Sequence, residues 1–190
     1  TVRQQRIVDA LRPFFGAEAD ALYEAHGRSL MKLTYFARQS GLPNFHRLAT
    51  GLALAQELLA EELTQRSVFH SPQAVTDFLK LHFAGQPHES FALMYLDAQS
   101  ALIAFEELFR GSLTQTSVYP REVMRRCLQH EAAALLMAHN HPSGSVEPSP
   151  ADQLLTQTLA KALAMIDVQV LDHIIVAGSR SLSFAQRGLL

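Results

Sequence analysis

The sequence predicts an α/β fold, a mixed sheet with packed helices, preceded by a small helical module. Apolar runs of strand length, bounded by turn residues, follow residue 87 and alternate with segments of helical periodicity. The first eighty residues show helical periodicity alone. The chain has 190 residues, 48% of them hydrophobic, enough for one large domain or two small ones. We therefore assign residues 1–80 to the helical module and residues 81–190 to the α/β domain.

Four helices are expected in the helical module. Apolar residues recur at helical spacing within residues 7–15, 30–37, 48–59 and 75–79. The first stripe ends near Gly16, and the second ends at the break formed by residues 40–43. Ser71 and Pro72 open the fourth helix, because serine is a favoured N-cap and proline is tolerated in the first turn.

The α/β domain begins with a predicted hairpin. Residues 91–96 and 101–105 are apolar runs of strand length, and residues 97–100 form the turn between them. Pro120 then opens a helix. The elements expected after it are a strand at 134–138, a helix at 150–165, a strand at 168–177 and a short strand at 181–184. This order is typical of a sheet with helices packed on it.

Composition and charge exclude several classes of protein. Sixteen Lys and Arg against eighteen Asp and Glu give a net charge of −2, which excludes a polycationic chromatin-type binder and a highly acidic disordered chain. The longest apolar run, residues 132–138, is too short to span a bilayer, and no secretory signal opens the sequence. We therefore expect a cytoplasmic protein with no membrane partner.

The single cysteine, Cys127, excludes a disulfide framework. It lies on the predicted inner side of its helix with Val123 and Leu128, which favours a role in filling the core.

A candidate metal site follows the strand at 134–138. Side chains two residues apart in a strand point to the same face, so His139 and His141 can converge on one point. The turn-rich residues 142–148 reverse the chain, and Ser149 then caps a new helix that carries Asp152 in its first turn. This helix start can fold back against the two histidines.

Two imidazoles and one carboxylate, with a fourth position open, form the ligand set of a catalytic zinc site. Zinc lowers the pKa of bound water to about 7 and so provides a nucleophile at neutral pH. A simpler interpretation uses the same residues. Ser149 and Asp152 also form an ordinary capping box, and both histidines are compatible with a surface loop. Spacing alone leaves both interpretations open.

The full motif resembles a known family. A His-x-His pair, ten residues and then Asp, with Ser three positions before that Asp, is similar to the JAMM (MPN-plus) metalloprotease signature. The string His-Asn-His-Pro-Ser-Gly at residues 139–144 resembles the bacterial RadC branch of that superfamily. Similar blocks occur in the same order at residues 107–113, 120–123, 171–176 and 183–189. The resemblance covers about residues 87–190 and implies a JAMM/MPN fold, which is cytidine-deaminase-like.

The resemblance also implies roles for individual residues. The residues that match the family's Zn²⁺ ligands are His139, His141 and Asp152. Ser149 matches the serine that helps hold the tetrahedral intermediate. The family's general base is a glutamate at or just before the first strand; Glu89 is our choice, and Glu106 and Glu107 are the alternatives. His173, on a core strand, is expected to be a packed, hydrogen-bonded histidine, with contact to a metal ligand as the alternative.

These features predict a zinc hydrolase that attacks an amide or isopeptide bond in a protein or peptide substrate. The alternative is a RadC-type DNA repair or replication accessory protein, with DNA contact or nuclease activity and a secondary metal site. A third class is a pure interaction domain, against which the intact ligand set argues. A zinc deaminase is disfavoured because the sequence lacks a Pro-Cys-x-x-Cys pair. The string His-Asn-His at residues 139–141 is also not an HNH nuclease motif, whose residues are scattered along the chain.

DNA contact would involve the helical module. Relatives of the family often carry a helix-hairpin-helix element with a Gly-x-Gly turn, and residues 41–48 match it in degenerate form. Pro43 replaces the second glycine and removes a main-chain N–H that could hold a phosphate. Basic residues without acidic neighbours are Arg28, Lys32, Arg38 and Arg47; a smaller basic cluster is Arg121, Arg125 and Arg126. Each set is compatible with a phosphate contact or with a solvated helix face.

Overall fold

The computed structural model describes residues 1–111 and 118–190. The chain forms two compact units: Thr1–Leu58 with Ala84–Gln86, and Leu59–Phe83 with Pro87–Leu190. The second unit holds the predicted sheet together with residues that the sequence analysis grouped with the helical module. The apolar side chains of these residues pack against the sheet. The second compact unit therefore begins at Leu59, whereas the sequence analysis placed the boundary at residue 80.

The first unit is helical, as predicted. Its elements are α1 (Val2–Phe15), the 3₁₀ helix η1 (Gly16–Glu18), α2 (Ala19–Ala25), α3 (Leu30–Gln39) and the first part of α4 (Pro43–Gln65). Its core contains Leu11, Phe15, Leu33 and Phe45. The sequence analysis missed η1 and α2, which are too short to show a periodic stripe. Helix α4 begins at Pro43, which the sequence analysis assigned to a break; proline is tolerated at the first helical position because that position needs no N–H partner.

The second unit contains a five-stranded sheet in the order β2-β1-β3-β4-β5. The strands are β1 (Ser90–Leu96), β2 (Leu102–Arg110), β3 (Ala134–Asn140), β4 (Gln169–Ala177) and β5 (Arg180–Ser183). The β3–β4 pair is parallel and the other pairs are antiparallel, so the sheet is mixed, as predicted. Strand β2 continues past the predicted residue 105, because its ladder with β1 reaches the Ser90–Arg110 pair.

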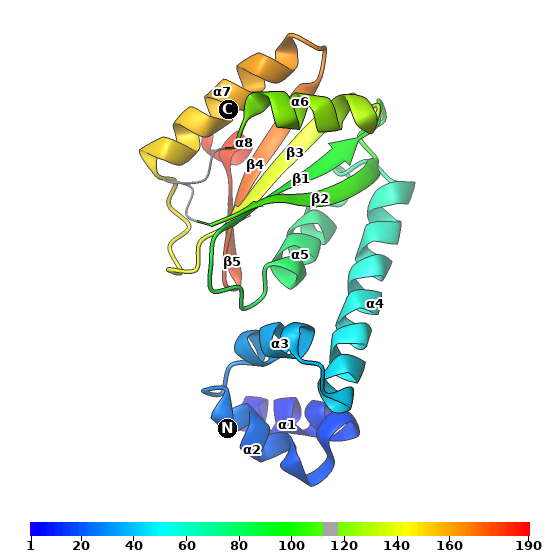
Figure 1. The fold of residues 1–190 in the computed structure, drawn as a ribbon, viewed down its shortest axis with the longest axis vertical. Coiled ribbons are helices and arrows are strands. Elements are labelled where there is room, and N and C mark those ends of the chain that lie inside the picture. Colours follow the sequence, from blue (N-terminus) through cyan, green and yellow to red (C-terminus); the bar gives the residue numbers. More distant parts are fainter. Residues whose placement is uncertain (112–117) are drawn as a thin grey trace. The chain divides into compact units, whose positions relative to one another are not determined.

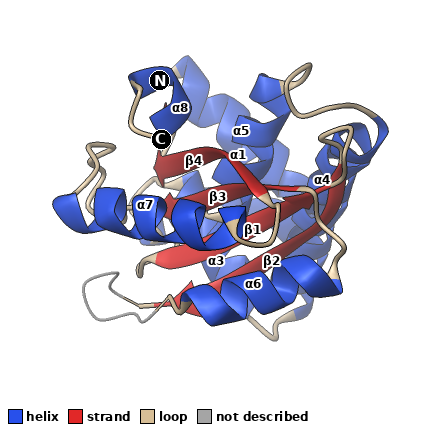
Figure 2. Ribbon diagram, turned by 90° about the horizontal axis from the view of Figure 1, so that it is seen from above, coloured by secondary structure: helices blue, strands red, loops and turns tan. Residues whose placement is uncertain are grey.

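Helices cover both faces of the sheet (Figures 1 and 2). Helix α5 (Pro72–His82) packs on one face, and α6 (Pro120–Gln129) and α7 (Pro150–Ala164) pack on the other. Alternation along each strand sends Met94 and Leu136 to the α5 face and Leu93 and Met137 to the α6/α7 face. All four are at most 4% exposed. The short helix α8 (Phe184–Arg187) ends the fold.

Helix α6 buries Cys127 but not Leu128. Cys127 is fully buried, as expected for core filling, and burial raises the pKa of its thiol to about 11. Leu128 was expected on the same side but is 62% exposed, because the helix turns it away from the sheet.

Ser112 and Leu113, part of one family-like block, lie outside the described residues. Among the helices in residues 1–111 and 118–190, none is both long enough and apolar enough to cross a membrane.

Candidate metal centre

Strand β3 brings the two predicted histidine ligands to one face of the sheet. It is a central strand, paired with β1 through Phe91–His139 and with β4 through His139–Ile175. The main-chain N–H of His141 donates to the carbonyl of Val176 at 2.8 Å, so the extended backbone continues past the strand end. His139 is fully buried, whereas His141 is partly exposed. Both rings therefore lie at the rim of the α6/α7 face.

The third predicted ligand comes from the start of α7. Ser149 is the N-cap, and its Oγ accepts the N–H of Asp152 at 3.1 Å. In return Oδ2 of Asp152 accepts the N–H of Ser149 at 2.7 Å and its hydroxyl at 2.8 Å. The capping box is therefore present. It holds the Asp152 carboxylate, which is only 2% exposed, in one orientation.

The three side chains converge. Nε2 of His139 lies 3.0 Å from Nε2 of His141 and 3.5 Å from Oδ1 of Asp152, and Nε2 of His141 lies 3.6 Å from Oδ2 of Asp152. Ligands about 2.0–2.2 Å from a tetrahedral ion are about 3.3–3.6 Å apart. The two histidine–aspartate separations fall in this range and the His139–His141 separation lies slightly below it, so a small separation of the two rings would fit the set to a zinc ion held by two nitrogens and one oxygen.

Hydrogen bonds on the far side of each ring orient the histidines. Nδ1 of His141 lies 2.8 Å from the carbonyl oxygen of Ser145. Because a carbonyl oxygen only accepts, this Nδ1 carries the hydrogen, and a neutral ring then has its lone pair on Nε2. Nδ1 of His139 lies 2.7 Å from Nε2 of His173, whose own Nδ1 contacts Thr156. His173 thus makes the contact with a proposed ligand that the sequence analysis gave as the alternative.

The electrostatics of His139 and Asp152 favour the protonation states that a metal needs, whereas a hydrogen bond with Asp152 raises the pKa of His141. Burial lowers the pKa of His139 to about 3, although Asp152 opposes this shift, so the ring is neutral at pH 7. Burial alone would raise the pKa of Asp152. Hydrogen bonds from its neighbours, led by the one from His141 and followed by those from Ser149, outweigh burial and hold that pKa below its usual range. A neutral imidazole and an ionised carboxylate are the forms that bind zinc.

Of the three predicted base candidates, Glu89 is the one whose charge acts on His141. Glu89 directly precedes strand β1, whose ladder with β3 pairs Phe91 with His139, so Glu89 lies at the end of β1 that is next to the His139 end of β3. Its charge is one of the interactions that raise the pKa of His141, after the hydrogen bond with Asp152. That Glu89 acts as the base stays a prediction.

The two alternative glutamates have other partners. Oε2 of Glu107 lies 2.9 Å from Nε2 of His82 on α5, so this side chain lies on the opposite face of the sheet. Glu106 accepts a hydrogen bond from the hydroxyl of Tyr95 at 3.1 Å and lies 3.1 Å from Nε2 of His130, at the end of α6. Both carboxylates therefore connect helices to the sheet.

Two residues at the site were missed by the sequence analysis. Oδ1 of Asn140 accepts the N–H of Ser90 at 2.7 Å, and its Nδ2 donates to the carbonyl of His88 at 2.9 Å, so Asn140 holds the backbone on both sides of Glu89. Thr156 lies one turn after Asp152 on the buried side of α7. The available signals were an amide between two histidines and a polar residue on an apolar helix face.

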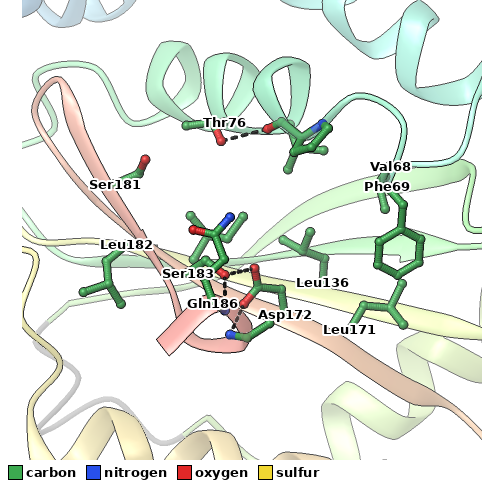
Figure 3. A pocket seen from close by; sticks show the side chains of 14 residues that line it. Val68, Phe69, Thr76, Leu136, Leu171, Asp172, Ser181, Leu182, Ser183 and Gln186 are labelled. Atoms are coloured by element: carbon green, nitrogen blue, oxygen red, sulfur yellow. Dashed lines mark hydrogen bonds between the residues drawn. The ribbon is translucent and has the colours of Figure 1, made fainter. Parts of the chain in front are cut away.

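A separate pocket lies on the α5 face (Figure 3). It has a volume of about 270 Å³ and includes Leu136, Leu171 and Asp172 in its lining. Asp172 accepts hydrogen bonds from the hydroxyl of Ser183 and, at 2.9 Å, from the N–H of Ala185. This carboxylate therefore secures the start of α8. None of the proposed metal ligands lines the pocket, so it is distinct from the candidate metal centre.

Most of the basic residues weighed for DNA contact have polar partners. Arg28 pairs with Glu24 at 2.6 Å, and Arg47 contacts Asn44. The second cluster is also paired, with ion pairs joining Arg121 to Glu122, Arg125 to Glu122 and Arg126 to Glu106. These pairs suit a solvated helix face, and DNA contact stays a prediction.

Comparison with known proteins gives a consistent result. Residues 69–189 match the family model described as the RadC-like JAB domain. A "UPF0758 protein" of Acidovorax sp. (strain JS42) is 62% identical over 139 residues, which are 73% of this chain and 58% of that protein. A protein of the same name from Paracidovorax citrulli is 50% identical over 188 residues, 95% of this chain and 74% of its own length. The match to the Acidovorax relative thus spans less than two thirds of that protein, and the shared name states no reaction.

Proposed function

The chain belongs to the RadC-like JAB domain family, and on that premise we propose that it is a zinc-dependent hydrolase of amide or isopeptide bonds. A protein or peptide is its proposed substrate. The observation that supports this proposal is the convergence of His139, His141 and Asp152 at separations close to those around a tetrahedral zinc ion. The ligand set leaves one position open, which is characteristic of catalytic rather than structural zinc sites.

The three ligands would hold the ion at the rim of the sheet. Zinc bound there would supply Lewis acidity, which polarises a substrate carbonyl and makes water a nucleophile at neutral pH. His139 contributes a neutral nitrogen from the protein interior, and Asp152 contributes the negative charge. His141 lies at the partly exposed side of the set, which is the side open to a substrate.

Glu89 is the proposed general base. Its carboxylate would accept the proton of the attacking water and deliver it to the nitrogen that leaves as an amine. Asn140 supports this role, because its two hydrogen bonds fix the main chain on both sides of Glu89. Proton transfer needs a heavy-atom separation of about 2.6–3.2 Å in the substrate complex, so a fixed backbone favours the reaction.

Ser149 has two proposed roles. Its hydroxyl donates to the Asp152 carboxylate, which orients this ligand toward the histidines. The family resemblance assigns the same hydroxyl to stabilising the oxyanion of the tetrahedral intermediate. The second role requires the O–H bond to turn from Asp152 toward the substrate, while Oγ continues to accept the N–H of Asp152.

Hydrolysis by the zinc-loaded chain tests the proposal. The substrates are a set of fluorogenic peptides and a peptide joined to a lysine side chain by an isopeptide bond. We expect Glu89→Gln to retain zinc and to lower turnover by about 10²–10⁴-fold, because the base is lost and the ligands remain. Glu106→Gln and Glu107→Gln serve as matched controls and are expected to retain turnover. Full activity in Glu89→Gln with loss in either control would show that another glutamate is the base.

A further inference from the structure

Buried polar contacts run from the candidate metal ligands into α7. Nδ1 of His139 lies 2.7 Å from Nε2 of His173, and Nδ1 of His173 lies 2.6 Å from Oγ1 of Thr156. The same Oγ1 lies 2.7 Å from the main-chain oxygen of Asp152. His139 and His173 are 0% exposed and Thr156 is 1% exposed, so bulk water is kept away from these atoms. We call these four residues the buried hydrogen-bond chain.

The contact between Thr156 and Asp152 sets the direction of donation along the buried hydrogen-bond chain. A carbonyl oxygen only accepts, so the Thr156 hydroxyl donates its one hydrogen to Asp152. Oγ1 then turns a lone pair toward His173, whose Nδ1 must carry a hydrogen and donate it. A charged ring that is shielded from water and hydrogen-bonded to no carboxylate is strongly unfavourable. The described partners of the His173 ring are His139, Thr156 and two phenylalanines, so the ring is neutral.

The direction decides which nitrogen of His139 faces the metal. Because Nδ1 of His173 carries the hydrogen, its Nε2 accepts, and Nδ1 of His139 donates to it. The lone pair of His139 is then on Nε2, the atom that lies 3.5 Å from Oδ1 of Asp152. We propose that His173 and Thr156 are positioning residues that fix the tautomer of His139 with Nε2 free to bind zinc. This inference rests on the zinc site of the proposed function.

Reversing the direction of the hydrogen bonds in the buried hydrogen-bond chain would disable the metal site. If Thr156 donated to His173, then His173 would donate from Nε2, and His139 would carry its hydrogen on Nε2, where a metal must bind. The carbonyl of Asp152 opposes reversal because it takes the Thr156 hydrogen. Asp152 thus acts twice: its carboxylate is a ligand, and its main-chain oxygen sets the tautomer of another ligand.

Thr156→Val is the most specific test. Valine keeps the branched shape of threonine but gives Nδ1 of His173 no acceptor. This change favours the reversed direction of the buried hydrogen-bond chain. We expect the zinc affinity of the 190-residue chain, measured by competition with a chromophoric chelator, to fall by about 10–100-fold, the usual effect of removing support for a metal ligand. Thr156→Ser restores the hydroxyl and is expected to restore affinity to within about threefold of the wild type.

The same helix offers a matched control. Oγ1 of Thr158 donates to the carbonyl of Leu154 at 2.7 Å, the same main-chain contact that Thr156 makes, but Thr158 lies on the exposed side of α7. Thr158→Val is therefore expected to leave zinc affinity unchanged. An equal loss in Thr156→Val and Thr158→Val would indicate a general effect on the helix and would overturn the proposal.

The ¹⁵N chemical shifts of the imidazoles in the metal-free chain provide a second readout. We expect hydrogen on Nδ1 of His139 and His173 in the wild type, and on Nε2 of His139 in Thr156→Val. Hydrogen on Nε2 of His139 in the wild type, or unchanged zinc affinity in Thr156→Val, would overturn the inference. Failure of the wild type to bind zinc would instead contradict the proposed function. The wild-type shifts decide the inference even if Thr156→Val does not fold.

Discussion

Each proposed ligand is held by a hydrogen bond on the side away from the metal position. His141 is held by the carbonyl of Ser145, His139 by His173, and Asp152 by Ser149. Such partners fix ring orientation and tautomer before a metal arrives, which reduces the ordering that binding requires. The geometry of the site therefore depends on the residues that hydrogen-bond to the ligands as much as on the ligands themselves.

Glu107 shows a carboxylate with a structural role. Burial alone would raise its pKa, but hydrogen bonds from His82, Ser90 and Arg110 outweigh burial and lower the pKa to about 2. The ionised form is therefore favoured in the folded chain. A carboxyl group whose pKa is lower in the folded state than in the unfolded state stabilises the fold above its unfolded pKa. That contribution is lost as the pH falls toward the folded pKa.

We expect Glu107→Gln to lower the free energy of unfolding by about 1–3 kcal/mol at pH 7, because a charged acceptor of several hydrogen bonds is lost. The difference from the wild type should shrink as the pH falls from about 4.5 to about 2, the interval between the unfolded and folded pKa values. Urea unfolding at a series of pH values measures it. A difference that stays constant from pH 6 to pH 3 would contradict this assignment.

At the residue scale, strand alternation and a helix cap indicated that His139, His141 and Asp152 could converge, although spacing alone left a structural interpretation open; the structure brings the three side chains together. Asn140 and Thr156 escaped prediction for a physical reason. Their partners are main-chain atoms and a histidine distant in sequence, and no local periodicity reports such contacts. Glu89 was selected on the family resemblance, and in the structure its charge is one of the interactions that raise the pKa of His141.

At the scale of elements, the site depends on where β3 ends and where α7 begins. The capping box at the start of α7 contributes to helix stability and to ligand orientation through the same two residues, Ser149 and Asp152. Ser149→Ala should therefore lower the free energy of unfolding by about 1 kcal/mol. It should also weaken zinc binding by about tenfold, because Asp152 loses a hydrogen bond that orients it. Chemical denaturation and chelator competition measure the two effects.

Ser29 provides the control for this prediction. It is the N-cap of α3, where its side chain accepts the N–H of Lys32 at 3.3 Å. Ser29→Ala is expected to lower stability by a similar amount and to leave zinc affinity unchanged. If both variants lost zinc affinity equally, the Ser149 effect would be a consequence of stability and not of ligand orientation.

Periodicity predicted the elements that bury a stripe or a face, including α1, α5, α7, β1 and β3. It failed where polar residues interrupt an element. Strand β2 includes Glu106 and Glu107, whose partners lie on helices far away in sequence, so its second half did not look like a strand. The short helices α2 and α8 bury too few residues to leave a pattern.

At the scale of the whole molecule, charge argues against strong binding to nucleic acid. The net charge is −2, and Arg28, Arg125 and Arg126 are already paired with carboxylates. Non-specific DNA binders have dissociation constants of about 10⁻⁴–10⁻⁶ M at physiological salt, through several phosphate contacts. We expect this chain to bind duplex DNA more weakly than about 10⁻⁴ M at 150 mM salt, as measured by fluorescence anisotropy. Micromolar binding with a steep salt dependence would favour the DNA-accessory alternative.

The zinc content of the purified chain, equilibrated with zinc and desalted, tests the central claim most directly. We expect about one zinc per chain in the wild type and near-complete loss in His139→Ala and Asp152→Ala, because each removes one of three protein ligands. His130→Ala, which removes a histidine bonded to Glu106 on the same face of the sheet, should keep its zinc. Full zinc content in both ligand variants, or none in the wild type, would contradict the metal centre.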